Sequence, residues 1–293
     1  MVSSPINNPV APAVENVREY FRLVAERCQL PPIPVVARKV LKMIENPDVN
    51  MQELCRVLYD DVALTGRILA VSRSPYYAQR KLPTTLVQAV QVLGFRTLRS
   101  VALTSAIHSL RVKGNKVSEK LWNHSLGVAL ATRILSKRAS LRDGDQAFLA
   151  GLMHDVGEMV LMYGDPRGFG GLIQEVEQSQ CKITDKEQQA YGFDHTLVGS
   201  TLLNYWNIDS QIGQAVLHHH SNSTSDNTEE LAAIVTAADH LCFKADLGFF
   251  GEPPKLDMAT MVRCQCDDDQ RAEEIVQEIR AAYEEESALF RPA

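Results

Sequence analysis

The amino-acid sequence predicts an all-α protein, and three observations favour this fold class. Apolar residues recur at the three- and four-residue spacing of a helix face through nearly every segment of the 293-residue chain. No run alternates apolar and polar residues for more than a few positions, as a half-buried β-strand would. Proline, glycine and aspartate separate the periodic runs, and these residues end helices or begin turns.

The N-terminal third of the chain predicts a series of short helices. Residues 13–28 place apolar side chains on one helical face, and the prolines of the following Leu-Pro-Pro-Ile-Pro run end that helix because proline lacks an amide donor. Further helices are expected over residues 35–46, 51–61, 63–72 and, on the two sides of Gly94, 84–110.

The remainder of the chain continues at helical spacing. Helices are expected over or within residues 121–131, 147–162, 192–206, 211–220 and 231–242. Residues 271–287 predict a terminal helix, because Ile275, Val276 and Ile279 share one face while acidic residues occupy the rest.

Composition excludes several classes of protein. With 45% hydrophobic and 23% charged residues, the chain has the make-up of an ordinary globular protein, not of a disordered or fibrous one. No apolar run approaches the roughly 20 residues that span a bilayer, and the N-terminus lacks the pattern of a signal peptide. The six scattered cysteines predict free thiols in a reducing compartment, and the pair Cys264 and Cys266 alone is weak evidence for a metal. We expect a cytoplasmic protein that does not enter a membrane.

Charge is distributed unevenly along the chain. Residues 62–142 carry 14 basic groups and one acidic group, a net charge of +13, whereas residues 143–293 carry 9 and 27, a net charge of −18. The basic segment could attract an anionic nucleotide, a nucleic acid or an acidic protein, or it could face the acidic half of the chain or water. We do not expect sequence-specific DNA binding, because no helix rich in base-reading side chains follows Gly94.

Histidines and aspartates interrupt several of the apolar helices. His154 and Asp155 stand together in an apolar run, and a buried carboxylate without a counter-charge costs several kcal/mol, so Asp155 requires a compensating partner such as a metal ion. The other members of this set are His124, His195, the run His218-His219-His220, and Asp239. Taken alone, a histidine such as His124 on an apolar helix is more often a hydrogen-bonded core residue than a ligand, and the triple run is also typical of a helix C-terminus. The ordered set favours a metal site, and a polar cluster held by internal hydrogen bonds is the alternative.

The order of these residues resembles the HD superfamily of metal-dependent phosphohydrolases. Upstream, the LPPIP, DDVALTGRIL and AVQVLG motifs are similar to the HDOD domain, a branch of that superfamily found in bacterial signalling proteins. One departure is Ser72-Arg73-Ser74, where the family usually has an Asn-Ser pair. The resemblance implies an HD-like helical domain with an N-terminal helical lobe. Its expected organisation is a helical lead-in over 1–24, an HDOD domain over 25–245 (lobes 25–113 and 114–245), and an acidic helical tail over 246–293.

The resemblance also implies two sets of metal ligands that share Asp155 as a bridge. It assigns His124, His154, Asp155 and Asp239 to one divalent transition metal, and His195, His219 and His220 to a second, with His218 as an alternative register for the pair. Fe, Mn, Ni or Zn suits such ligands, and two ions can hold a hydroxide for attack on a phosphodiester. HDOD domains generally lack part of this set and act as non-catalytic modules, whereas this chain retains seven positions.

Two positions separate this chain from the related HD-GYP enzymes. Those enzymes have a lysine where this sequence has Glu158, and a Gly-Tyr-Pro motif where this sequence continues from His220 into Ser-Asn-Ser-Thr. An acid in place of the lysine removes transition-state stabilisation and is expected to repel an anionic substrate. We therefore expect a signalling module that binds a protein partner. The alternative is an active phosphohydrolase on a nucleotide or cyclic di-nucleotide, and a nucleic-acid binder is not expected.

Overall fold

The structure is a computed structural model that describes residue 19 and residues 33–77, 82–141, 143–179, 181–220 and 227–290. These residues form helices, turns and loops, and no strand occurs among them. The predicted all-α fold class is therefore confirmed. The helix expected over residues 13–28 lies, apart from Glu19, outside the described residues.

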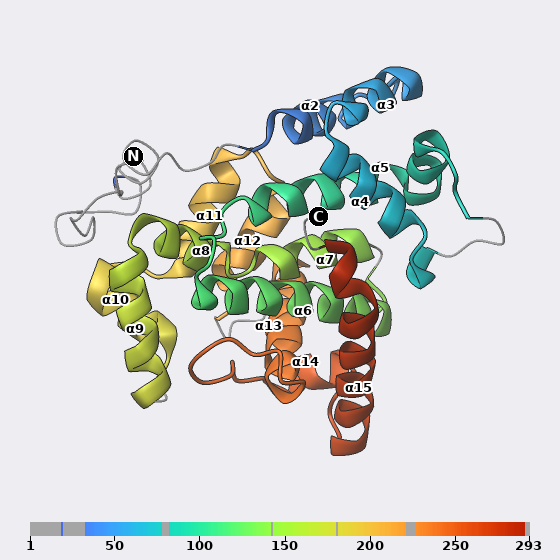
Figure 1. Ribbon diagram of the computed structural model, residues 1–293. Coiled ribbons are helices and arrows are strands. Elements are labelled where there is room, and N and C mark those ends of the chain that lie inside the picture. The colour runs from blue at the N-terminus through green and yellow to red at the C-terminus, as the bar shows by residue number, and fades with distance from the viewer. Residues whose placement is uncertain are drawn as a thin grey trace. The chain divides into compact units, whose positions relative to one another are not determined.

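The chain divides into two compact units. Unit 2 contains Pro32–Ser109 and Ala281–Ala293. Its helices are α2 (Val35–Ile44), α3 (Met51–Tyr59), α4 (Val62–Ser72), η2 (Pro75–Tyr77), α5 (Leu86–His108) and η3 (Ser287–Phe290). Within unit 2, α2 and α4 pack against α5, and η3 contacts α4 (Figure 1).

Side-chain caps explain where the helices of unit 2 begin. Asn50 accepts hydrogen bonds from the amides of Gln52 and Glu53, and Asp61 accepts one from the amide of Leu64. Thr85 and Gln88 form a reciprocal capping box at the start of α5. Each cap satisfies amides that have no partner within the first turn, so the polar residue before each apolar run sets the helix start.

Gly94 breaks α5 into two helical segments, as the sequence predicts. Its backbone has φ 72° and ψ 172°, a region that only glycine adopts without strain. We expect Gly94→Ala to destabilise the protein by about 1–3 kcal/mol. The matched control is Gly66→Ala in α4, where nothing lies within 4 Å of the added methyl group, and a gain of about 0.4–1 kcal/mol is expected. Urea unfolding measures both, and equal effects of the two variants would contradict this account of the kink.

Unit 1 contains the predicted metal ligands, and its described helices run from Leu110 to Arg280. They are α6 (Lys116–Arg138), α7 (Gly144–Met153), α8 (Val156–Gly164), α9 (Pro166–Ser179), α10 (Ile183–Tyr191), α11 (His195–Tyr205), α12 (Ser210–His218), α13 (Asn227–Lys244), α14 (Met258–Arg263) and most of α15 (Asp269–Glu286). Helices α6, α7 and α13 pack on one another, α12 packs against α11 and α13, and α8 packs against α11 (Figure 1). These contacts bring helices that are distant in the sequence around one centre.

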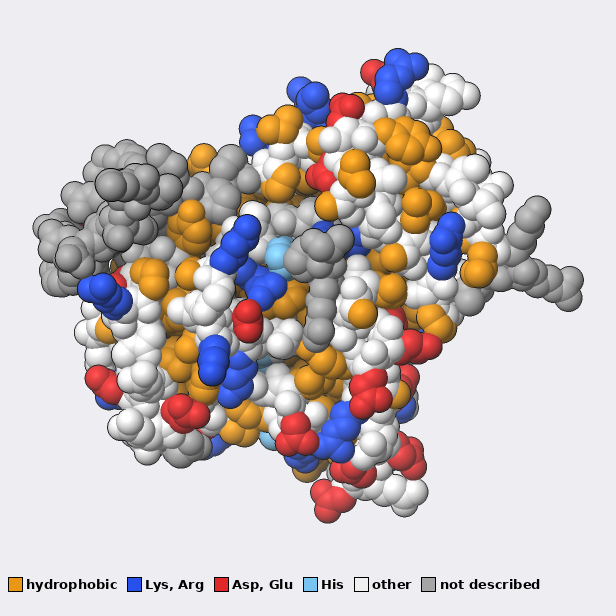
Figure 2. All heavy atoms as spheres, viewed as in Figure 1, with side chains coloured by type: hydrophobic (Ala, Val, Ile, Leu, Met, Phe, Trp, Pro, Cys, Tyr) orange, Lys and Arg blue, Asp and Glu red, His pale blue; other side chains and the backbone are white. Residues whose placement is uncertain are grey.

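Acidic side chains gather along α15 (Figure 2). Arg138, from the basic segment, pairs with Glu278 of this helix at 2.8 Å, and Arg280 pairs with Asp246 at 2.9 Å. Both pairs are at least partly exposed to solvent, so each contributes little to stability. On its other face α15 buries Ile275, Val276 and Ile279, as its apolar spacing predicts.

Two expectations from composition can be compared with the described residues. The five cysteines among them are free thiols, and Cys28 lies outside the described part of the chain. In that described part, every helix is too short or too polar to span a bilayer.

Candidate metal centre

The seven predicted ligand residues come together in unit 1 from five different places in the chain. His124 lies in the middle of α6, Asp239 lies in α13, and His195 is the first residue of α11. Six of the seven are buried, and His220 is exposed. They are His124, His154, Asp155, His195, His219, His220 and Asp239.

Local structure turns these side chains toward the centre. Asp194 caps α11, accepting hydrogen bonds from the amides of Thr196 and Leu197, and this cap places His195 at the helix start. His219 directly follows α12, and the hydroxyl of Thr236 in α13 donates a hydrogen bond to its carbonyl oxygen. The cluster thus draws on helix ends as well as helix interiors.

His154 and Asp155 occupy a break between two helices and not one continuous helix. Because residues 147–162 are mostly apolar, the sequence suggests a single helix, and this expectation is wrong. Helix α7 ends at Met153 and α8 begins at Val156, with Asp155 at φ −103° and ψ 18°. The break lets two adjacent residues point into the same centre, which consecutive residues of one helix cannot do.

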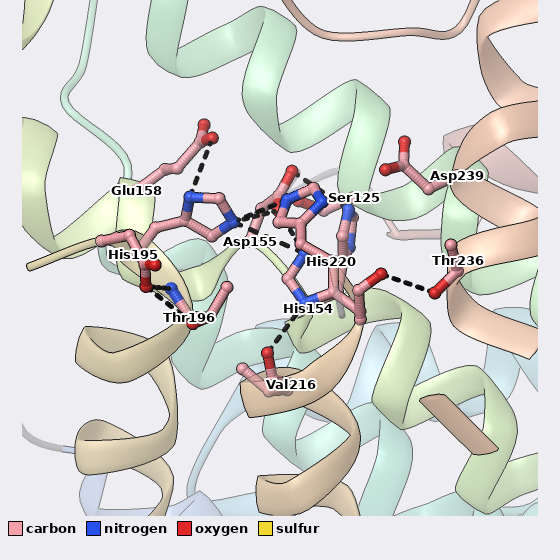
Figure 3. A network of polar contacts seen from close by, with 12 residues as sticks. Ser125, His154, Asp155, Glu158, His195, Thr196, Val216, His220, Thr236 and Asp239 are labelled. Atoms are coloured by element: carbon pink, nitrogen blue, oxygen red, sulfur yellow. Dashed lines mark hydrogen bonds and ion pairs between the residues drawn. The ribbon is translucent and has the colours of Figure 1, made fainter. Parts of the chain in front are cut away.

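Asp155 stands between two groups of ligands (Figure 3). Its Oδ2 lies 3.0 Å from Nε2 of His154 and 3.4 Å from Nε2 of His124. Its Oδ1 lies 3.4 Å from Nε2 of His195 and 3.5 Å from Nε2 of His219. The two carboxylate oxygens of Asp155 therefore contact different groups of histidines. We call His124, His154, Asp239 and Asp155 Oδ2 the first position, and His195, His219, His220 and Asp155 Oδ1 the second position.

Hydrogen bonds on the outer ring nitrogens fix four of the histidines. Nδ1 donates to the carbonyl oxygen of Leu247 in His124, of Gly151 in His154 and of Val216 in His219, each at 2.8 Å. In His195 Nδ1 donates to the carboxylate of Glu187 at 2.7 Å. With the proton on Nδ1, a neutral imidazole presents the lone pair of Nε2 inward, which is the form that binds a metal ion.

The inward-facing ring nitrogens lie close to one another. Nε2 of His124 lies 3.2 Å from Nε2 of His154, and Nε2 of His195 lies 3.1 Å from Nε2 of His220 and 3.4 Å from that of His219. Lone pairs this close repel one another unless a proton or a metal cation lies between them. The residues therefore fit a cation at either position.

Asp239 also indicates that the first position fits a cation. Its side chain is buried, and within the described part of the chain its Oδ1 has no hydrogen-bond donor, only Nε2 of His124 at 3.3 Å. A buried carboxylate oxygen without a donor is costly. Coordination of a cation would satisfy it.

The pKa values show how the centre depends on positive charge. Burial opposes protonation of His124, but the adjacent carboxylates of Asp155 and Asp239 outweigh it and raise the pKa of His124 to about 10. Burial would raise the pKa of Asp155, yet the charge of His154 and hydrogen bonds from His124, His154 and His219 hold it well below its usual range. Without a metal ion, protons supply the cationic charge that the two carboxylates need.

Glu187 is a functional candidate that the sequence reasoning missed. Its buried Oε2 accepts hydrogen bonds from both Nδ1 and the backbone amide of His195, at 2.7 Å and 2.9 Å. A sequence signal exists, because Glu187 interrupts the apolar stripe of Ile183 and Tyr191 at four-residue spacing on α10. A carboxylate in the middle of a buried helix face indicates a specific partner.

Glu158 lies behind His195 and not in the centre itself (Figure 3). Its side chain is buried, and its Oε1 is 3.7 Å from Nδ1 of His195. Burial and the neighbouring charge of Asp155 raise the pKa of Glu158 well above its usual range. The expectation that Glu158 repels an anionic substrate stays a prediction, and the side chain lies on the Nδ1 side of His195.

Other residues considered from the sequence lie elsewhere. His218, the last residue of α12, is exposed and is not part of either group, so His219 and His220 form the pair. His240 donates from Nδ1 to the carbonyl oxygen of Pro254 at 2.8 Å. Cys264 and Cys266 are buried, but among the described residues they belong to no group with metal-ligand spacing.

A helical domain in which His, His-Asp, His, His-His and Asp converge on one buried carboxylate has the architecture of an HD-type domain. The model of the HDOD domain family matches residues 30–222, which is more than half of the chain. The chain therefore belongs to the HDOD domain family, and this confirms the resemblance seen in the sequence. The matched range contains every residue of the cluster except Asp239.

Solved structures and one curated protein are similar to this chain. An HDOD domain protein of unknown function from Geobacter sulfurreducens has 27% identity and a TM-score of 0.69, over 92% of this chain and 99% of the other. A candidate signal transduction protein from Marinobacter aquaeolei VT8 has 19% identity and a TM-score of 0.73, over 96% of this chain and 67% of the other. A candidate phosphohydrolase from Shewanella amazonensis SB2B has 19% identity and a TM-score of 0.69, over 92% and 96%. The latter two support the fold alone.

The curated protein is uncharacterised and comes from Treponema pallidum (strain Nichols). It is 25% identical over 206 residues, which cover 68% of this chain. The match spans only 39% of that protein's length. It is thus a longer protein of which this chain resembles a part.

Proposed function

We propose that this HDOD protein is a regulatory module with a metal-loaded HD centre, which acts by binding a protein partner. The observation that carries the proposal is the set of Nε2 lone pairs that face one another and Asp155 across 3.0–3.5 Å. Imidazole and carboxylate ligands of this kind suit Fe, Mn, Ni or Zn. Membership of the HDOD family, which is found in bacterial signalling proteins, favours a regulatory role in a bacterial cytoplasm.

A second candidate is hydrolysis of a phosphodiester in a nucleotide or cyclic di-nucleotide. The division of Asp155's two oxygens between two ligand groups favours it, because a bridged pair of ions is the arrangement that activates a nucleophile in such hydrolases. Against it, Glu158 occupies the position at which the HD-GYP enzymes have lysine, and it points behind His195. The first candidate therefore stands as the conclusion.

Metal analysis and turnover separate the two candidates. The protein is purified without chelator, its metals are measured, and hydrolysis of a generic phosphodiester is followed after addition of Mn²⁺, Fe²⁺ or Ni²⁺. We expect bound transition metal without turnover above that of Asp155→Ala. Robust turnover that Asp155→Ala abolishes would establish the hydrolase instead, and a protein that binds no metal after reconstitution would exclude both.

Chelation is expected to lower the melting temperature. A metal ion that binds only the folded state stabilises it, by about 2.7 kcal/mol when the free ion is at 100 times its Kd. Differential scanning fluorimetry with and without a chelator measures the shift, and Asp155→Asn, which keeps the shape of the side chain, is the control expected to show none. An unchanged melting temperature in the native protein would indicate a polar cluster held by protons.

A further inference from the structure

We propose that Glu187 is a positioning residue that makes the two metal positions unequal, by holding His195 as a charge-supported ligand of the second position. The inference rests on the proposed metal centre and adds to it a residue that belongs to neither of its two positions. Glu187 comes from α10, which contributes no ligand to either position.

The hydrogen bonds of the four anchored histidines differ in one respect. His124, His154 and His219 each donate from Nδ1 to a neutral backbone carbonyl. Of these four, only His195 donates to a carboxylate, and at 2.7 Å its bond is the shortest. A carboxylate behind an imidazole orients the ring and increases its basicity toward a metal ion on the other nitrogen. This support reaches the second position and not the first.

Charge balance gives an independent reason for the difference. The first position has the carboxylate of Asp239 in addition to one oxygen of Asp155, whereas the second position has three imidazoles and the other oxygen of Asp155. A divalent cation at the second position thus has less negative charge in direct contact. Glu187, through the Nδ1 proton of His195, supplies the negative charge that Asp239 supplies at the first position.

The geometry assigns this role to Glu187 and not to the neighbouring Glu158. Glu187 receives two N–H groups of His195, and both bonds end on the same oxygen, so ring and backbone are held together. Glu158 lies 3.7 Å from Nδ1 of His195, beyond hydrogen-bond distance. The two acids therefore form a matched pair, in which only one has the contact that the proposal requires.

Titration of the metal-free protein with Zn²⁺ tests the proposal. Two Zn²⁺ ions are expected to bind the native protein. In Glu187→Gln, where the amide oxygen still accepts the two hydrogen bonds but the charge is lost, one affinity is expected to fall 10- to 100-fold while the other stays unchanged. Two controls are expected to leave both affinities unchanged. They are Glu158→Gln and Asp185→Asn, the latter removing an exposed carboxylate from the same helix.

A second measurement does not depend on metal. In the metal-free native protein, the Nδ1 proton of His195 is expected to give a strongly downfield NMR resonance, which moves upfield in Glu187→Gln while those of His124 and His154 remain. Should Glu187→Gln fail to fold, Glu187→Asp restores the charge on a shorter side chain, and its Zn²⁺ affinity at the second position is expected to be weakened less than tenfold.

The outcomes separate this inference from the proposed function. A native protein that binds no Zn²⁺ overturns the metal centre and this inference with it. A native protein that binds Zn²⁺, with equal losses at both positions or no loss in Glu187→Gln, overturns the role of Glu187 and leaves the metal centre standing. A larger effect of Glu158→Gln than of Glu187→Gln also overturns it.

Discussion

Asp155→Ala is expected to abolish metal binding at both positions. Asp155 contacts both ligand groups, with Oδ2 beside His124 and His154 and Oδ1 beside His195 and His219. Without it, the second position keeps imidazoles alone, and no carboxylate is in direct contact with a cation there. Elemental analysis of the purified variant is expected to find less than about a tenth of the native metal content, because loss of even an outer-shell partner of a ligand typically lowers metal affinity about 10- to 100-fold.

Asp239→Asn is the matched control for Asp155→Ala. Asp239 contacts the first position only, so the variant is expected to retain the ion of the second position. Without metal, Asp155→Ala is also expected to be less stable than the native protein. Removing Asp155 leaves buried imidazoles without their counter-charge, and breaking such a buried pair costs about 3–5 kcal/mol of unfolding free energy. A full complement of metal in Asp155→Ala would contradict the bridged arrangement.

Among the Gly→Ala substitutions in unit 1, Gly157→Ala is expected to lower the free energy of unfolding most. A Cβ atom at this position would lie 1.9 Å from the carbonyl oxygen of His195 and 2.8 Å from the backbone nitrogen of Gly199. Both neighbours are backbone atoms, so a rotamer change cannot relieve the overlap, and α8 and α11 would have to separate. Overpacking in a core costs typically 1–3 kcal/mol and occasionally more, and we expect about 3 kcal/mol or more here.

Gly157→Ala is also expected to disturb the metal centre, because the carbonyl oxygen that the new Cβ atom would overlap belongs to His195, a predicted ligand. Movement of α11 displaces His195 from Asp155, so the second position is expected to lose its ion before the first does. Gly171→Ala in α9 is the control, since nothing lies within 4 Å of the added methyl group and a gain of about 0.5–1 kcal/mol is expected. Urea unfolding and Zn²⁺ titration measure both effects. Native stability in Gly157→Ala would show that α8 and α11 are not packed as described.

Much of the fold could be predicted from helical spacing and from helix breakers. The helix expected over 35–46 appears as Val35–Ile44, and the interrupted helix expected over 84–110 appears as Leu86–His108 with its kink at Gly94. Apolar periodicity indicates which face of a helix is buried, and glycine and proline act locally on the backbone, so one sequence is enough to predict helices and their breaks. The break at His154 and Asp155 could not be predicted in this way, because neither residue is glycine or proline and apolar residues continue on both sides.

The candidate site could also be predicted only in part from the sequence. The order of histidines and aspartates, read through the family resemblance, named seven residues that the structure brings together, and metal binding by them remains a proposal. Glu187 and the burial of Glu158 could not be found that way. A family motif marks residues that touch a ligand, whereas Glu187 acts through His195 and shows in the sequence only as a polar interruption of an apolar stripe.

The sequence by itself determined the helical class, the interruption of a helix at Gly94, and the membership of an HDOD family whose ligands recur in a set order. Those properties depend on neighbours within a turn or two of helix, or on a pattern along the chain. Only the tertiary structure decided that Asp155 lies between two ligand groups, that Nε2 atoms of different histidines face one another, and that Glu187 contacts His195. These depend on distances of 2.7–3.5 Å between residues from different helices, and such distances are set by the packing of α6, α7, α8, α11, α12 and α13 as a whole.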